Sequence, residues 1–208
     1  MSLCKADRDG MVHVNVLSLR QKLFQYRGYT PVPFLLAMVI FAKPVAWMMF
    51  LGGCLAILGE LLRYWGVAYA GSLTRVTGEV GAPEVIMAGP YAHIRNPLYV
   101  GNIIVYTGIG IMSNALSPWL VAAAFLYFVF QYVEIVALEE EFLEKKFGDT
   151  YADFRNNVPA FLPRLQPYRR EAQEHQRPDW KGALRSERRT LQALGLVVLI
   201  LILLWQFR

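Results

Sequence analysis

Long apolar stretches alternate with polar stretches along this chain. Five apolar runs stand out, at residues 31–42, 45–70, 98–112, 119–137 and 191–205. The second run is interrupted by Glu60 and Arg63. Several runs approach the roughly 20 residues that a helix needs to cross a bilayer. The pattern therefore predicts an all-α, polytopic membrane protein with about five transmembrane helices.

Proline marks the start of most of these runs. The prolines that stand at or just before a run are Pro31, Pro44, Pro97 and Pro118. Proline costs little in the first helical turn, because an N–H at that position has no intrahelical acceptor. The first run is the shortest, and about 12 helical residues rise about 18 Å against a hydrocarbon core of about 30 Å. It must therefore tilt or extend if it crosses.

The charges lie mostly between the apolar runs. The chain is 55% hydrophobic and 18% charged, with a formal net charge of +5, which excludes a disordered chain and a uniformly basic nucleic-acid-binding face. If all five runs cross and the N-terminus is cytosolic, 19 of the 21 Lys and Arg residues lie in the cytosol; if the first does not cross, 14 do. The positive-inside rule favours five spans. We expect no cleaved signal peptide.

This topology divides the chain into five parts. They are a basic cytosolic arm, two transmembrane helices, a core with a loop and a tight helical hairpin, a basic cytosolic segment and a C-terminal transmembrane helix, at residues 1–30, 31–70, 71–163, 164–189 and 190–208. The loop is rich in Gly and Pro, and irregular backbone of this kind needs water or burial in protein. Cys4 and Cys54 suggest neither a disulfide framework nor a metal cluster. Chemistry is expected on the cytosolic side.

The densest group of functional side chains is the string GPYAHIRNPLYVG at residues 89–101, which runs from the loop into the third apolar run. It supplies aromatic rings, hydrogen-bond donors and a cation beside a helix N-terminus, which attracts anions. An interfacial aromatic belt with one lipid-facing cation is the simpler alternative.

The third and fourth runs are joined by a short turn at residues 113–117, so their helices must be antiparallel. At 1.5 Å per residue from this turn, Pro97 lies about 24 Å along one helix and Glu139 about 33 Å along the other. Glu139 and Glu140 are therefore expected to meet the 89–101 string at the cytosolic edge. A solvated helix extension is the alternative interpretation of this acidic run.

Ionisable residues within apolar runs are further candidates for a functional site. Glu60 and Arg63 lie three residues apart, either as a functional pair or as an intrahelical ion pair that reaches the interface. Glu134 has no basic residue within one turn of its own helix, so its partner must come from another helix, water or a proton. The candidate catalytic residues are Glu60, Arg95 and Glu134.

These features together resemble a known family. The string at 89–101, the hairpin, the paired glutamates and the stretch FGDTY at 147–151, followed by Val158 and Pro159, are similar to the integral-membrane methyltransferases of the isoprenylcysteine carboxyl methyltransferase and phospholipid methyltransferase superfamily. The similarity covers residues 71–163. It implies a methyltransferase that uses S-adenosylmethionine, acts on a lipidic or apolar acceptor in the bilayer, and has its active site facing the cytosol.

The resemblance also implies a cofactor pocket formed by the loop, the start of the helix at Pro97 and the segment after the hairpin. The residues expected to bind S-adenosylmethionine are Glu84, Val85, Ile86, Tyr91, His93, Asn96, Pro97, Leu98, Tyr99, Gly101, Glu139 and Glu140. Glu139 is expected to orient the cofactor's ammonium or ribose, and Arg95 or the helix N-terminus its carboxylate. No resident metal is expected.

Two positions depart from the family pattern. Asn96 stands where the family commonly has histidine; asparagine keeps a donor and an acceptor but cannot titrate, which favours a binding contact over acid–base chemistry. Ile135 stands where prenylcysteine enzymes have a substrate-contacting arginine. A cationic or neutral acceptor group is therefore favoured over a carboxylate, and Glu134 or Glu60 is the candidate base if the acceptor is an amine.

Other functions stay open at this point. A phospholipid N-methyltransferase belongs to the same superfamily, and NADPH-dependent membrane reductases that act on sterol-like substrates are similar in their C-terminal half. A noncatalytic scaffold or small transporter is supported only by the spans. Cofactor preference, S-adenosylhomocysteine against NADP, separates these classes.

Overall fold

The computed structural model describes residues 19–71 and 83–207, and every regular element in those ranges is helical. The α-helices are α2 (Pro31–Ile40), α3 (Ala46–Ala70), α4 (Pro97–Ser113), α5 (Trp119–Phe147), α6 (Asp149–Asn157) and α7 (Trp180–Phe207). Two 3-10 helices, η2 (Gly89–Ala92) and η3 (Glu171–Gln173), complete the fold. Residues 19–26 are also helical. The all-α prediction is confirmed.

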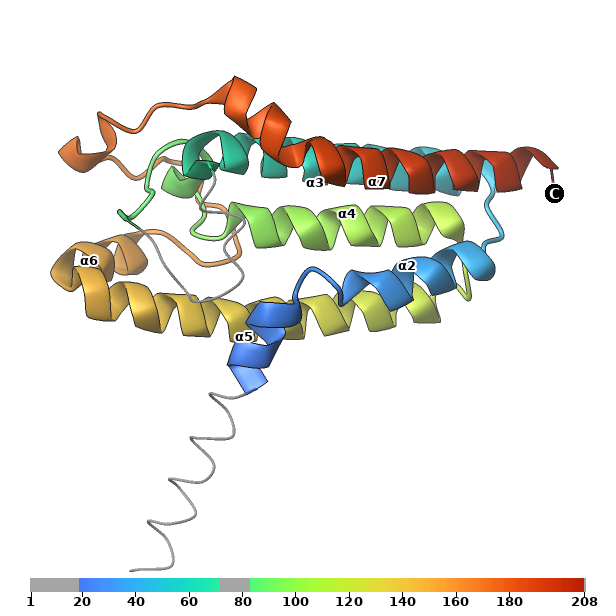
Figure 1. The fold of residues 1–208 in the computed structure, drawn as a ribbon, viewed down its shortest axis with the longest axis horizontal. Helices are drawn as coiled ribbons and strands as arrows, with labels where there is room; N and C mark the ends of the chain where they lie inside the picture. Colours follow the sequence, from blue (N-terminus) through green and yellow to red (C-terminus); the bar gives the residue numbers. More distant parts are fainter. Residues whose placement is uncertain (1–18, 72–82, 208) are drawn as a thin grey trace, which may run out of the picture.

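The long helices lie side by side and alternate in direction (Figure 1). One end of the bundle carries the α2–α3 connection and the α4–α5 turn, residues 41–45 and 114–118, and we name it the turn end. The opposite end carries residues 83–96, α6 and the chain up to residue 179, and we name it the loop end. α2, α4 and α7 run toward the turn end, and α3 and α5 run back.

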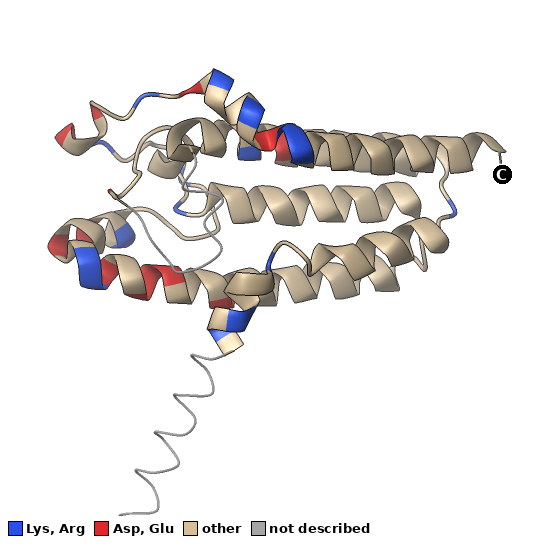
Figure 2. Ribbon diagram, viewed as in Figure 1, with Lys and Arg blue, Asp and Glu red and all other residues tan. Residues whose placement is uncertain are grey.

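The distribution of charge agrees with a membrane position. Lys, Arg, Asp and Glu gather at the loop end, while most of the helical surface toward the turn end is uncharged (Figure 2). α3, α5 and α7 are long and apolar enough to cross a membrane by length and composition. α4 has 17 residues and rises about 26 Å, whereas α2 has 10 and rises about 15 Å. The predicted polytopic membrane fold is confirmed, and its first apolar helix is the shortest.

Prolines mark helix starts as the sequence pattern indicated. Pro31 and Pro97 are the first residues of α2 and α4, and Pro118 directly precedes α5. α4 ends at Asn114, whose φ of 48° is left-handed, a conformation that asparagine tolerates better than most residues. Its Nδ2 donates a hydrogen bond to the Lys43 carbonyl (3.0 Å), which ties the two connections of the turn end together.

α3 and α4 pack closely because glycines face one another along their contact. A Cβ on Gly108 would lie 2.6 Å from the Gly52 carbonyl oxygen and 2.7 Å from the Ala56 nitrogen. A Cβ on Gly59 would lie 2.7 Å from the Gly101 carbonyl oxygen. Small residues at such positions let helix backbones approach and pack by van der Waals contact. We name these four glycines the glycine seam.

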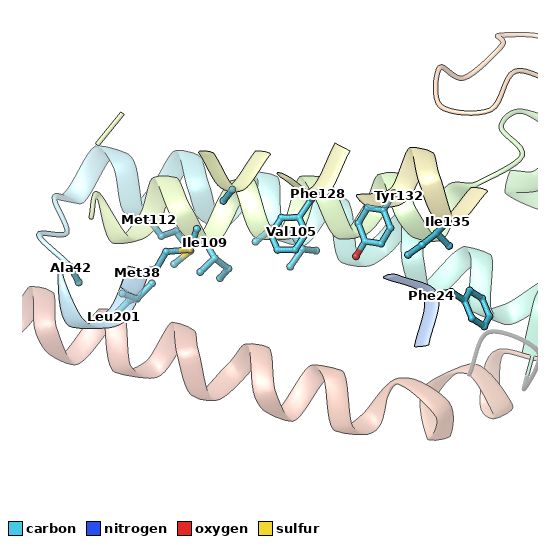
Figure 3. Packing of buried hydrophobic residues seen from close by; sticks show 12 residues of the cluster. Phe24, Met38, Ala42, Val105, Ile109, Met112, Phe128, Tyr132, Ile135 and Leu201 are labelled. Carbon is cyan, nitrogen blue, oxygen red and sulfur yellow. The ribbon is translucent and has the colours of Figure 1, made fainter. Parts of the chain in front are cut away.

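A hydrophobic core fills the space between α2, α4 and α5 (Figure 3). Phe128, Tyr132 and Ile135 of α5 belong to this core together with Val105 and Ile109 of α4, and all five are buried. Lipid tails are as apolar as these side chains, so close packing rather than transfer from water holds the helices together.

α7 lies against α3 over its N-terminal half and reaches α2 farther along. Arg63 of α3 forms an ion pair with Glu187 of α7 (2.6 Å). The Asp179 N–H donates to the Ala68 carbonyl oxygen (2.7 Å) just before α7 begins. Leu201, near the other end of α7, is fully buried. Polar contacts therefore fix the start of α7, and apolar packing fixes its end.

Replacing Gly52 with alanine is expected to destabilise the protein. The new methyl group would meet the Gly108 carbonyl and the Met112 nitrogen (2.6 Å), so α3 and α4 must move apart, at a cost of about 1–3 kcal/mol. Thermal unfolding in mild detergent, followed by circular dichroism, measures the loss. Gly53→Ala is the matched control, because nothing lies within 4 Å of its Cβ position. Equal melting temperatures for the two variants would argue against the glycine seam.

Candidate functional site

A cavity of about 450 Å³ lies at the loop end, where the start of α4 meets the last turns of α5. Side chains of α3, α6 and α7 and of residues 24–28 also line it. The sequence-predicted residues that it contains are Glu84, Val85, Ile86, Tyr91, Arg95, Asn96, Pro97, Leu98, Tyr99, Glu139 and Glu140. The structure thus brings together residues that are up to 56 positions apart, from Glu84 to Glu140.

The two ends of the helical hairpin are joined by side-chain hydrogen bonds. The Tyr99 hydroxyl donates to Glu139 Oε1 (2.6 Å), and Arg95 Nη2 donates to Glu140 Oε1 (2.6 Å). The rings of Tyr99 and Tyr132 stack with centroids 4.7 Å apart. The predicted meeting of the start of α4 with the acidic end of α5 is confirmed.

The Arg95 guanidinium links three segments. Its Nε and Nη2 donate to Glu140, and its Nη1 donates to the carbonyl oxygens of Arg155 (2.8 Å) and Val158. The main-chain N–H of Arg95 donates to the Pro159 carbonyl (2.9 Å). Charge-assisted bonds of this kind are among the stronger ones in proteins. The contacts favour a role for Arg95 in holding α6 and the chain after it against α4.

The N-terminus of α4 forms part of the cavity wall. Asn96 makes no side-chain capping bond, and its Nδ2 donates instead to the Ala160 carbonyl (3.3 Å). Pro97 has no N–H, and helix geometry leaves the N–H groups of Leu98 and Tyr99 without intrahelical acceptors. These groups and the helix dipole favour an anion, such as a carboxylate, at this part of the wall.

Tyrosines supply aromatic and hydrogen-bonding surface to the cavity. Tyr91 and Tyr151 lie at the loop end, and burial raises the pKa of each above its ordinary value, so both phenols stay neutral at physiological pH. Tyr106 and Tyr132 line the part of the cavity that lies deeper in the bundle. Neutral phenols offer a flat ring for stacking and a hydroxyl for hydrogen bonding.

Two residues expected to bind the cofactor do not line the cavity. His93 Nδ1 lies 2.9 Å from the Arg164 carbonyl oxygen, and its ring is tilted against Trp65 with centroids 6.4 Å apart. Gly101 belongs to the glycine seam, where a Cβ would lie 2.8 Å from the Gly59 carbonyl oxygen. Their neighbours give both residues a packing role.

Glu60 and Glu134, two of the candidate catalytic residues, also lie outside the cavity lining. Glu134 forms an ion pair with Arg20 (2.7 Å), so its partner comes from another helix, one of the three alternatives that the sequence left open. Glu60 is 8% exposed and lies 3.2 Å from Arg63 Nε on its own helix. The expected role of these carboxylates as bases therefore has no support from their positions.

α7 also contributes to the cavity, which the sequence pattern did not predict. Glu187 and Thr190 line the cavity beside Arg63. Arg63 Nη2 donates to Glu187 Oε2 (2.6 Å), and Arg63 Nη1 donates to the side-chain oxygen Oδ1 of Asn102. The signal in the sequence was weak, because Glu60 already offered Arg63 a carboxylate on its own helix, and Glu187 lies in a polar segment just before the last apolar run.

Cations reach the cavity from segments other than α5. Ile135 of α5 is fully buried in the core, whereas Arg63 of α3 and Arg27 line the cavity. Arg27 lies over the Phe24 ring, 4.0 Å from its centroid, and interacts electrostatically with Glu139. The cavity therefore presents both signs of charge.

The chain belongs to the phospholipid methyltransferase family, whose sequence profile matches residues 47–150, half of its length. The match extends from α3 through α4 and α5 into the start of α6. The family resemblance inferred from the sequence is confirmed.

Individual curated proteins are also similar to this chain. The chain is 34% identical over 122 residues to a cobalt-zinc-cadmium resistance protein of Cupriavidus metallidurans, covering 59% of this chain and 50% of that protein. It is 32% identical over 130 residues to the protein-S-isoprenylcysteine O-methyltransferase of Tribolium castaneum, covering 61% of this chain and 46% of the relative. The chain spans about half the length of these curated relatives.

A solved structure is also similar. The eukaryotic intramembrane Ras methyltransferase, isoprenylcysteine carboxyl methyltransferase, matches with a TM-score of 0.53 and 25% sequence identity. The match covers 76% of this chain and 54% of that one. The membrane fold is thus shared beyond the region that the family profile covers.

Arg95→Ala is expected to destabilise the loop end by roughly 3 kcal/mol, because it removes the main partner of the poorly exposed Glu140 carboxylate and frees the chain after α6. Hydrogen exchange of residues 149–164 and thermal unfolding measure the effect. Lys145→Ala is the control, since its ion pair with Glu141 is exposed and contributes less than about 1 kcal/mol. Unchanged exchange in the Arg95 variant would argue against a role for Arg95 in holding α6 and the chain after it.

Proposed function

We propose that this chain is an integral-membrane methyltransferase that uses S-adenosylmethionine to methylate a lipidic or apolar acceptor. The observation that carries the proposal is the cavity at the meeting point of α4 and α5. Its walls include residues of the 89–101 string, which holds the densest group of functional side chains in the sequence. Family membership supports it, as do relatives that are named as protein-S-isoprenylcysteine O-methyltransferases.

The residues of the cavity fit S-adenosylmethionine in size and chemistry. About 450 Å³ falls in the range of small-molecule sites. Glu139 would bind the ammonium or the ribose hydroxyls of the cofactor, and the N-terminus of α4 would bind its carboxylate. Tyr91 and Tyr151 would supply aromatic surface for the adenine.

When bound, S-adenosylmethionine supplies an electrophilic methyl group on a sulfonium. In-line methyl transfer requires no covalent intermediate with the protein, so the side chains act mainly by holding the reactants in line. The hydrogen bond from Tyr99 fixes the Glu139 carboxylate, and Arg95 fixes its neighbour Glu140. These two contacts orient the donor side of the proposed site.

We assign the acceptor to the deeper part of the cavity, beside Arg63, Glu187 and Tyr106. Arg63 is enclosed by two carboxylates, since Glu60 lies 3.2 Å and Glu187 2.6 Å from its guanidinium nitrogens. This excess of acidic groups favours a neutral or cationic acceptor over a carboxylate. If the acceptor is an amine, Glu187 is the carboxylate that lines this part of the cavity and would take its proton.

We further propose that the loop end faces the cytosol. The basic residues gather at this end (Figure 2), as the positive-inside rule requires of cytosolic segments. A charged donor would then enter from water, and an apolar acceptor from the bilayer. A cavity at the ends of the helices serves both routes.

The first test is cofactor choice. S-adenosylhomocysteine, but not NADP, is expected to bind the purified protein in calorimetry, and Tyr99→Phe and Glu139→Gln should each weaken binding about tenfold by loss of a hydrogen bond to a charged group. Glu141→Gln is the control, because Glu141 pairs with Lys145 at the surface. Binding of NADP alone would favour a reductase, and binding of neither would favour a noncatalytic protein.

The second test identifies the acceptor class. Methyl-labelled S-adenosylmethionine is incubated with the protein and a membrane lipid extract, and the labelled product is treated with mild base. The acidic surroundings of Arg63 lead us to expect label that resists base, as in an N-methyl or thioether product. Release of the label would indicate an ester and would contradict the expected acceptor, while a resistant phospholipid product would indicate phospholipid N-methylation.

A further inference from the structure

Residues 84–88 belong to no helix, and the first three of them form part of the cavity wall. The side-chain amide of Gln176, in the chain between η3 and α7, supplies hydrogen bonds to their main chain. Gln176 Oε1 accepts from the N–H groups of Met87 (2.9 Å) and Ala88 (3.1 Å). Its Nε2 donates to the Val85 carbonyl oxygen (2.8 Å). One amide therefore serves this segment as donor and as acceptor, as a neighbouring strand would.

Gln173, the last residue of η3, extends the same arrangement. Its Nε2 donates to the Met87 carbonyl (2.7 Å) and to the Tyr168 carbonyl (3.0 Å), and its Oε1 accepts from the Arg170 N–H (2.9 Å). The Gln176 N–H donates to the Gln173 carbonyl (3.0 Å). The two glutamines thus form one connected unit against the 84–88 segment.

The segment lies between this glutamine unit and the cavity. Glu84, Val85 and Ile86 line the cavity. The side chains of Val85 and Met87 are 8% and 3% exposed and belong to a cluster that includes Phe154 of α6. Buried main-chain groups need hydrogen-bond partners, and here glutamine amides supply them. The amides therefore set the position of the main chain that forms this wall.

We propose that Gln176, assisted by Gln173, is a positioning residue for the donor side of the cavity. It acts through Val85 and Ile86. Both glutamines lie beyond residues 47–150, which the family profile covers. The C-terminal part of the chain therefore positions residues 84–86, which lie within the region that the family shares. This role rests on the proposed function, because the ligand whose binding it affects is the methyl donor.

Gln176→Glu tests the role with little change of shape. The new carboxylate keeps an oxygen for the N–H groups of Met87 and Ala88, but it replaces the amide donor with an oxygen. That oxygen would face the Val85 carbonyl and the Glu84 carboxylate, both of which lie within hydrogen-bond distance of the present amide nitrogen. Repulsion is expected to displace residues 84–86. Glu174→Gln, the reverse change at an exposed neighbouring position, is the matched control.

The experiment uses the full chain in detergent or nanodiscs. Gln176→Glu is expected to weaken S-adenosylhomocysteine binding about tenfold and to raise the KM for S-adenosylmethionine to a similar extent. The kcat measured at saturating S-adenosylmethionine, with a membrane lipid extract as acceptor, should stay unchanged, as should the melting temperature. The amides of Met87 and Ala88 should exchange hydrogen faster in this variant. Glu174→Gln should match the wild type in every measurement.

The outcomes separate this role from the proposed function. Failure of the wild-type chain to bind S-adenosylhomocysteine would overturn both. Wild-type binding that Gln176→Glu leaves unchanged would overturn the positioning role alone. If Gln176→Glu does not fold, Gln173→Glu repeats the test against the Met87 carbonyl. Loss of folding in both variants would make the glutamines purely structural and would overturn the proposal.

Discussion

The cavity depends on one constraint of the chain, the short turn that forces α4 and α5 to run antiparallel. α5 has 29 residues and α4 has 17, so α5 extends 12 residues, about 18 Å, beyond the start of its partner. This C-terminal extension of α5 lies outside the apolar part of the bundle and places Glu139 and Glu140 beside the N-terminus of α4. The bonds of Tyr99 with Glu139 and of Arg95 with Glu140 then lock two helix ends that the turn has already brought together.

Local signals explain how much of the fold and site could be predicted from the sequence. Apolar run length and proline position depend on neighbouring residues, and the constant rise of a helix converts them into depth along the bundle. The hairpin and the meeting of residues 96–99 with Glu139 follow from these signals. The role of each residue within the 89–101 string does not, because consecutive residues of a turn or helix point in different directions. His93 and Gly101 therefore pack against α3 while their neighbours line the cavity.

The remaining parts of the site depend on contacts between distant segments. Arg63 and Glu187 are 124 residues apart, and Met87 and Gln176 are 89 apart. No periodicity in the sequence connects such pairs. A glutamine in a polar segment has the same sequence context whether its amide is solvated or bonds the main chain of a distant segment. A buried charge gives only a weak signal: Arg63 needs a carboxylate partner, but Glu60 on the same helix supplies one, so the sequence did not indicate Glu187. Tertiary structure alone assigns the glutamines.

The position of α7 has a consequence for biogenesis. Ribosomes and the insertion machinery deliver helices in sequence order, so the hairpin can assemble before α7 has been synthesised. Until Glu187 arrives, Arg63 has Glu60 of its own helix as its carboxylate partner (3.2 Å) and lacks the shorter ion pair with Glu187 (2.6 Å). The cavity of the nascent chain therefore lacks the part of its wall that Glu187 and Thr190 of α7 supply. Insertion of the last helix adds this second ion pair and the α7 side of the cavity wall in a single event, which delays a complete site until the bundle is whole.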